Sequence, residues 1–129
     1  MHRCSPACKV HALPAARLAD AHVTFFTVRV DGELAAIGAL REIDAKRGEI
    51  KSMRAADAWR GKGAGKAMVG YLLAEARARG YRWIGLETGR HPVFEPAQRL
   101  YAGHGFCECP PFGDYVSDDF SLCLGRDLA

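Results

Sequence analysis

A glycine-rich stretch at residues 60–66 is the part of this sequence whose residue types and spacing most directly support chemistry. Gly61, Gly63 and Gly65 alternate with small and basic residues just before an amphipathic segment. Glycine lets a backbone approach a ligand without a Cβ clash, and the free N–H groups and dipole at a helix start attract phosphate. The stretch therefore predicts a site for a phosphorylated cofactor.

Two common nucleotide-binding loops do not fit this spacing. A Walker A loop needs Gly-x4-Gly-Lys-Ser/Thr, but the second glycine position counted from Gly61 is Lys66, and no Ser or Thr follows. A dinucleotide loop needs Gly-x-Gly-x-x-Gly, and its third glycine position falls on Lys66 or Met68. The spacing excludes both interpretations of the loop.

The elements that must position this loop follow from hydrophobic periodicity and turn residues. The turn signal at Asp31–Gly32 and a second turn at 44–48 connect the first three strands in an antiparallel meander. The predicted order is strands at 23–30, 33–41 and 49–55, a helix ending at Gly80, a strand at 81–88, a helix at 97–103, and strands at 106–109 and 119–124. The strand after the long helix is parallel to the one before it, so the sequence predicts an α+β fold with a mixed sheet.

Length and composition limit the classes of function. The 129 residues fit one domain, residues 1–129. A net charge of +3 does not indicate a nucleic-acid partner, and no apolar run approaches the roughly 18 residues of a membrane span. The five cysteines lack zinc spacing, which favours reduced thiols in a cytoplasmic protein with no metal.

Two motifs, in the order and setting expected of one fold, carry a family resemblance. The first is Arg-x-x-Gly-x-Gly, formed by Arg60, Gly63 and Gly65. The second, A-x-x-L-Y-x-x-x-G-F, is formed by Ala97, Leu100, Tyr101, Gly105 and Phe106. On these motifs the chain resembles the GNAT family of N-acetyltransferases over roughly residues 48–107, and segments 48–54, 86–89 and 111–115 resemble its bacterial members.

The resemblance implies the acetyltransferase fold, a mixed and mostly antiparallel sheet whose third and fourth predicted strands splay apart to admit acyl-CoA. It implies transfer of an acetyl group from acetyl-CoA to a primary amine of a small molecule or peptide by direct attack. The alternative is an acyl-CoA-binding sensor or regulatory module without transfer. The cofactor-binding residues implied by the motif are Met53, Arg54, Ala55, Arg60, Gly61, Lys62, Gly63, Ala64, Gly65 and Lys66.

The resemblance also implies the catalytic residues. Tyr101 occupies the place of the acid that protonates the leaving thiolate, and a backbone N–H near Met53 or Arg54 would polarise the thioester carbonyl. The base is Glu49, at the position of a catalytic glutamate in some members, or Glu87 instead or through a water. Asp114, Tyr115 and Asp118 border the expected acceptor side and are candidates for attracting a cationic amine.

The beginning of the chain differs from the family pattern. Family domains usually open with a strand and one or two helices, but only about 22 residues precede the first strand predicted here. The sequence therefore predicts that the first strand and helix are missing, either because the chain has lost them or because the true start lies upstream of Met1. A missing strand would bare a sheet edge, and bare edges associate, so we expect a homo-oligomer, with a dimer as the simplest form.

Overall fold

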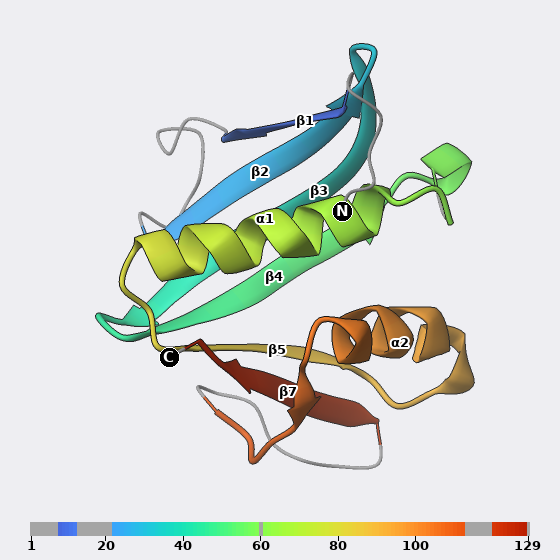
Figure 1. Ribbon diagram of the computed structural model, residues 1–129. Helices are drawn as coiled ribbons and strands as arrows, with labels where there is room; N and C mark the ends of the chain where they lie inside the picture. The colour runs from blue at the N-terminus through green and yellow to red at the C-terminus, as the bar shows by residue number, and fades with distance from the viewer. Residues whose placement is uncertain (1–7, 13–21, 60, 113–119, 129) are drawn as a thin grey trace.

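The computed structural model describes residues 8–12, 22–59, 61–112 and 120–128. Seven strands form one mixed sheet in the order β1-β2-β3-β4-β5-β7-β6. In Figure 1, α1 crosses in front of β3 and β4, and α2 lies in front of the end of β5. The element bounds are β1 Cys8–Ala12, β2 Val23–Val30, β3 Glu33–Asp44, β4 Arg47–Ala55, α1 Ala64–Ala78, β5 Trp83–Gly89, α2 Glu95–Gly103, β6 Cys107–Glu108 and β7 Ser121–Asp127.

Antiparallel hairpins build the first half of the sheet. The β2–β3 turn has positive φ at both Asp31 and Gly32, which matches the right-handed twist of a two-residue hairpin. Helix α1 buries its apolar stripe on this half-sheet, where Met68 and Leu72 are fully buried. The approach is close, since a Cβ built on Gly38 would lie 2.9 Å from Cγ of Met68. Glycine at this point of β3 lets the helix seat against the sheet.

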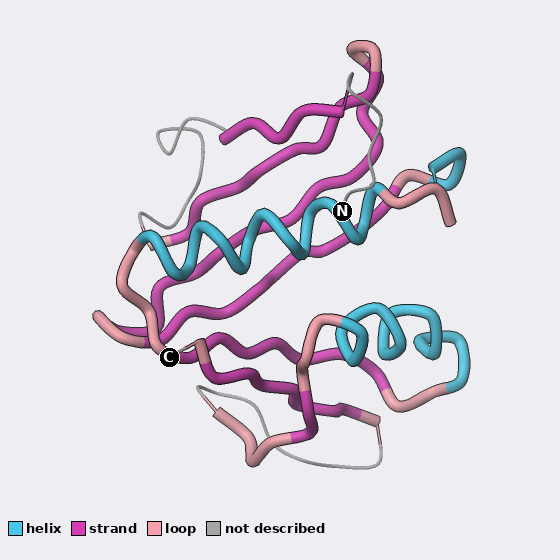
Figure 2. The backbone as a smooth tube through the Cα atoms, in the orientation of Figure 1, coloured by secondary structure: helices cyan, strands magenta, loops and turns pink. Residues whose placement is uncertain are grey.

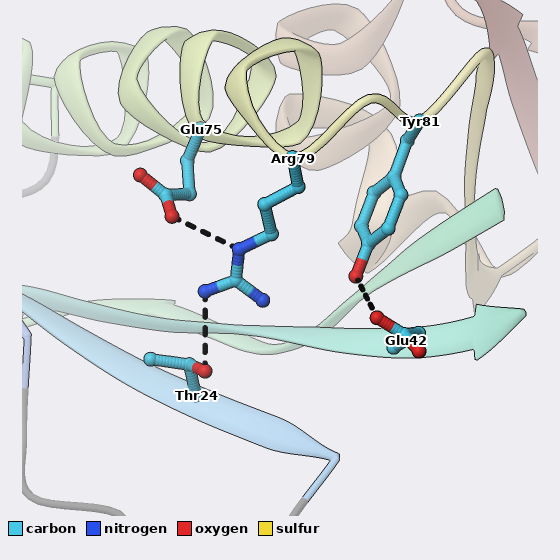
Figure 3. A network of polar contacts seen from close by, with 5 residues as sticks. All are labelled: Thr24, Glu42, Glu75, Arg79 and Tyr81. Atoms are coloured by element: carbon cyan, nitrogen blue, oxygen red, sulfur yellow. Dashed lines mark hydrogen bonds and ion pairs between the residues drawn. The ribbon is translucent and has the colours of Figure 1, made fainter. Parts of the chain in front are cut away.

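Polar contacts fix the C-terminal end of α1 to the same half-sheet, as Figure 3 shows. Arg79 Nε donates to Glu75 on the helix at 2.9 Å, and Arg79 Nη2 donates to the hydroxyl of Thr24 on β2 at 3.2 Å. Just after the helix, Tyr81 OH donates to Glu42 of β3 at 3.0 Å. The direction of the chain as it enters β5 is thereby set by β2 and β3.

Strands β4 and β5 meet only at their beginnings. Their parallel pairing covers three pairs, Arg47–Trp83, Gly48–Ile84 and Glu49–Gly85. Beyond this short junction, which we call the seam, the two strands diverge (Figure 2). On its other side β5 is paired with β7 along its whole length, from Trp83 to Gly89. The predicted splaying of these two strands is confirmed.

The structure corrects the prediction for the start of the chain. Cys8–Ala12 pairs antiparallel with β2, so the sheet has a strand where the sequence predicted that the first one is missing. Proline and scattered alanine around this segment gave no strand signal. A helix between β1 and β2 would fall at 13–21, outside the described residues. Since β1 covers β2, the bare edge expected at β2 is absent.

The remaining elements agree with the sequence in type and differ at their ends. Strand β3 continues to Asp44, α2 begins at Glu95 rather than at 97, and β7 runs from Ser121 to Asp127 rather than from 119 to 124. Within the described residues, neither helix is long and apolar enough to cross a membrane.

Candidate active site

The glycine-rich loop presents the start of α1 without a side-chain cap. Gly63, the N-cap residue, has φ of 90° and makes no side-chain capping hydrogen bond. Gly61 also has positive φ, at 73°. The first hydrogen bond of the helix runs from Ala67 N to Gly63 O at 2.9 Å, which leaves the earlier amides without a helical acceptor. An anion can therefore be bound by the backbone here.

Side chains around the loop add positive charge. Lys62 and Lys66 are exposed, and Nζ of Lys62 lies 5.7 Å from the centre of the Trp59 ring. Trp59 belongs to the 3₁₀ turn Asp57–Trp59 that precedes the loop and packs against the core. Arg60, predicted to bind the cofactor, lies outside the described residues.

Strand β4 is kinked where it leaves β5. Ser52 has φ of 55°, a left-handed conformation, and the pairing with β3 shifts register in the same region. A shift of this kind is a bulge, which re-aims the backbone beyond it. Met53, Arg54 and Ala55 follow, and in the described chain they lie beyond the pairing with β5. This edge of β4 can pair with an extended ligand.

The beginning of α1, the end of β4 and α2 converge at one glycine. A Cβ built on Gly65 would lie 3.4 Å from Leu100 of α2 and 3.7 Å from Met53 of β4. Next to Leu100, Tyr101 is only 5% exposed and packs edge-on against Phe106 with ring centres 5.7 Å apart. Burial alone raises the pKa of Tyr101 to about 12. The phenol is thus held protonated within the core cluster.

Glu49 lies in the seam and is 1% exposed. Its Oε1 accepts from Arg41 Nε at 2.9 Å, and its Oε2 lies 4.0 Å from Lys51 Nζ. Arg41 was not among the residues predicted from the sequence. The signal was present, because a short turn between β3 and β4 places Arg41 opposite Glu49 in the register.

Glu87 differs from Glu49 in its surroundings. It is half-buried in β5, and the described part of the chain shows it with no ion pair or hydrogen bond. Its neighbour across the ladder is Cys123 of β7. Burial is the main reason that the pKa of the Cys123 thiol is raised, and the charges of Glu87 and Glu49 raise it further. Both carboxylates therefore lie near Cys123.

Alternation along the strands puts the catalytic candidates on two sides of the sheet. Ile84 and Leu86 of β5 join the core cluster that contains Tyr101. Glu87 points the other way, onto the face away from α1 and α2, which we call the far face. Asp114, Tyr115 and Asp118, the predicted acceptor-side residues, lie outside the described residues. No group of three or more potential metal ligands gathers in the described ranges.

Comparison with known proteins gives consistent results. Residues 2–106 match the model of the "Acetyltransferase (GNAT) family". The chain is 41% identical to "Uncharacterized N-acetyltransferase YsnE" of Bacillus subtilis over 96% of this chain and 82% of that protein. It is 39% identical to "Uncharacterized N-acetyltransferase YedL" of Escherichia coli over 96% of this chain and 78% of that protein.

A solved structure shares the fold at low identity. A GNAT family acetyltransferase from Elizabethkingia anophelis with acetyl-CoA bound superposes with a TM-score of 0.77 at 14% identity. The match covers 95% of this chain and 99% of that one.

Proposed function

Because this chain belongs to the acetyltransferase (GNAT) family, we propose that it transfers the acetyl group of acetyl-CoA to a primary amine of a small molecule or peptide. The observation that carries the proposal is the divergence of β4 and β5 beside the uncapped start of α1. The divergence leaves a strand edge for an extended thiol arm, and the helix start offers amides for its pyrophosphate.

The cofactor residues follow from these two features. The backbone of Gly61–Lys66 holds the pyrophosphate, with Lys62 and Lys66 as exposed counter-charges. The edge of Met53–Ala55 pairs with the amide groups of the pantetheine arm. Arg60 completes the loop motif and stays a prediction.

The reaction is a direct displacement at the thioester. The neutral amine nitrogen forms a bond to the acetyl carbon and the C–S bond breaks. The nitrogen loses a proton as it becomes the amide, which restores the proton that the acid gives to the thiolate of CoA. An amide of β4 near Met53 stabilises the oxyanion that develops on the carbonyl. Tyr101 donates to the thiolate, and a pKa of about 12 keeps this phenol protonated throughout the physiological range.

We assign the role of general base to Glu87. We assign to Glu49 the structural role of stabilising the seam between β4 and β5. Both oxygens of Glu49 lie near cations, and an amine could reach them only by breaking a buried ion pair. Glu87 lacks such a partner among the described side chains and is half-buried on the far face. Its carboxylate can take the proton of the incoming ammonium directly or through a water.

Acetyl-CoA binding is the first test. Acetyl-CoA should raise the thermal unfolding midpoint, because a ligand that binds only the folded state stabilises it, whereas NAD and ATP should not. No shift with acetyl-CoA would contradict both transfer and the alternative of a non-catalytic acyl-CoA sensor.

Acetyl transfer to a set of amines, followed by mass spectrometry, separates the enzyme from the sensor. Tyr101→Phe should lower kcat about 100-fold if the phenol acts as the acid. Tyr71→Phe is the matched control, because Tyr71 is 37% exposed on α1, where its ring packs against Phe26. Equal rates for wild type and Tyr101→Phe would remove the acid role. A shift with acetyl-CoA but no transfer to any amine would favour the sensor.

Three expectations stay predictions. Asp114, Tyr115 and Asp118 are expected to attract a cationic amine. A cytoplasmic location is expected from the cysteine pattern, and fractionation of the native host would test it. A homodimer is expected, although β1 covers the β2 edge that motivated it. Light scattering coupled to size exclusion would decide the oligomeric state.

A further inference from the structure

Glu87 is framed by aromatic rings that lie directly on the sheet. Unbroken pairing between β5 and β7 places Trp83, Gly85, Glu87 and Gly89 on the far face of β5 in succession. A Cβ built on Gly85 would collide with the Trp83 ring, and one built on Gly89 would collide with the Phe94 ring. The two glycines on either side of Glu87 are therefore covered by rings.

The ring on the seam side is held from several directions. Trp83 also covers Gly125 of β7, where a built Cβ would lie 2.5 Å from Cζ2 of the indole. Phe112 packs edge-on against Trp83, with ring centres 5.1 Å apart and an angle of 79° between their planes. The Trp83 ring thus packs against Phe112 and lies directly on the backbone of β5 at Gly85 and of β7 at Gly125.

The ring on the other side is open to solvent. Phe94 is 43% exposed, and it lies over Gly89, two residues beyond Glu87. Gly85 and Gly89 are four residues apart, or about 13 Å at the rise of a strand. Glu87 leaves β5 on this face between the two ring-covered glycines.

We infer that Glu87, Trp83 and Phe94 form an ammonium-binding subsite, and that the acceptor is a compact cationic amine with an apolar body and no carboxylate. The inference rests on the proposed acetyl transfer for the identity of this ligand as the acceptor. A half-buried carboxylate without a partner in the described chain attracts a cation, and the rings on either side of it offer apolar surface to the body of the ligand. A carboxylate on the ligand would be repelled by Glu87.

Phenethylamine and phenylalanine are the decisive pair of probes, because they differ only by a carboxylate. The chain has two tryptophans, so in Trp59→Phe all indole emission comes from Trp83. With CoA present, phenethylamine should change this emission with saturation, and phenylalanine should bind at least about tenfold more weakly. Equal binding of the two probes, or no binding of phenethylamine, would overturn the subsite.

Variants identify the groups responsible. On the Trp59→Phe background, Glu87→Gln and Phe94→Leu should each weaken phenethylamine binding, about tenfold and about threefold respectively. The matched controls are Glu33→Gln and Tyr71→Leu, an exposed carboxylate and an exposed ring outside the frame. Unchanged affinity in Glu87→Gln or in Phe94→Leu, with a native circular dichroism spectrum, would overturn the assignment.

Binding and transfer are read separately, so the two proposals fail in different ways. Saturable phenethylamine binding without acetyl transfer to any amine would contradict the enzyme and leave the subsite standing. Acetyl transfer with an equal or higher kcat/KM for phenylalanine than for phenethylamine would contradict the subsite and leave the enzyme standing.

Discussion

The first half of the sheet (β1–β4) and the second half (β5–β7) each carry one candidate carboxylate near the seam. The surroundings of the two carboxylates are opposite in character. On the β4 side Glu49 is buried, paired with Arg41 at 2.9 Å and close to Lys51. On the β5 side Glu87 lies between aromatic rings, and the described residues offer it no charged partner. A buried ion pair joins strands, whereas a carboxylate without a partner can take a ligand or a proton.

The same contrast extends to the packing of the two halves. Strands β2, β3 and β4 carry small and aliphatic residues that α1 covers, with Met68 and Leu72 at the centre. Strand β5 instead has glycines that let rings lie on its far face. The first half thus supplies most of the buried framework, whereas the second half carries rings and Glu87 on its far face.

The largest expected effect comes from removing the charge on the second half. Glu87→Gln should lower kcat by about 100-fold or more, the usual loss when a general base is removed. Its free energy of unfolding should change by less than about 0.5 kcal/mol, because no ion pair among the described residues is broken. Steady-state kinetics and urea denaturation would measure the two quantities. A near-normal kcat in Glu87→Gln would show that Glu87 is not the general base, although among the described residues it lacks the ion pair that Glu49 has.

Removing the charge on the first half should act on stability. Glu49→Gln should lower the free energy of unfolding by about 2–3 kcal/mol, below the range for fully buried pairs because Arg41 is 29% exposed. Urea denaturation would measure the loss, and Glu33→Gln is the control at an exposed glutamate. Wild-type stability together with a lost kcat would reverse the roles of the two carboxylates.

The burial of Tyr101 in the apolar interior can be tested by the pH dependence of the free energy of unfolding. Its pKa is raised by burial from 10.0 to about 12, so the folded state favours the neutral phenol. The associated stability is complete below pH 10 and is lost as the pH rises through 12. Between pH 9 and pH 11.5, wild type should lose about 2 kcal/mol more than Tyr101→Phe in urea denaturation. Parallel pH profiles would mean that the phenol is solvated.

The smallest effect concerns the kink of β4. Ser52→Val should cost about 1–2 kcal/mol in the free energy of unfolding, because a β-branched residue tolerates positive φ poorly. Ser52→Gly should be nearly neutral, since relief of strain offsets the added flexibility of the unfolded chain. Thermal and urea unfolding of both variants would decide. A stabilising valine would indicate a regular strand at this position.

The family and most of the architecture could be predicted from the sequence, because their signals are local. The turn at Asp31–Gly32, the glycine-rich loop and the motif around Tyr101 each fix an element through neighbouring residues. The predicted GNAT resemblance is confirmed by the family match over residues 2–106. Strand β1 escaped prediction, because Cys8–Ala12 owes its conformation to pairing with β2 rather than to its own composition.

The candidate site was predicted less completely, because its character depends on register and on side chains far apart in the sequence. The sequence predicted Glu49 as a candidate base, but its ion pair with Arg41 follows from the β3–β4 register. The frame around Glu87 needs the ring of Phe94 to lie on Gly89. No pattern within a single strand reveals such a contact, so the sequence left the choice between Glu49 and Glu87 open.

The short seam also bears on the order in which the chain folds. Strands β2, β3 and β4 are joined by tight turns, so their contacts close small loops at low entropic cost. The pairing of Arg47 with Trp83 closes a loop that contains all of α1. Contacts between distant residues form more slowly. We therefore expect a nascent chain to assemble β2–β4 with α1 first, so that β4 and β5 pair at the seam only in the last folding step.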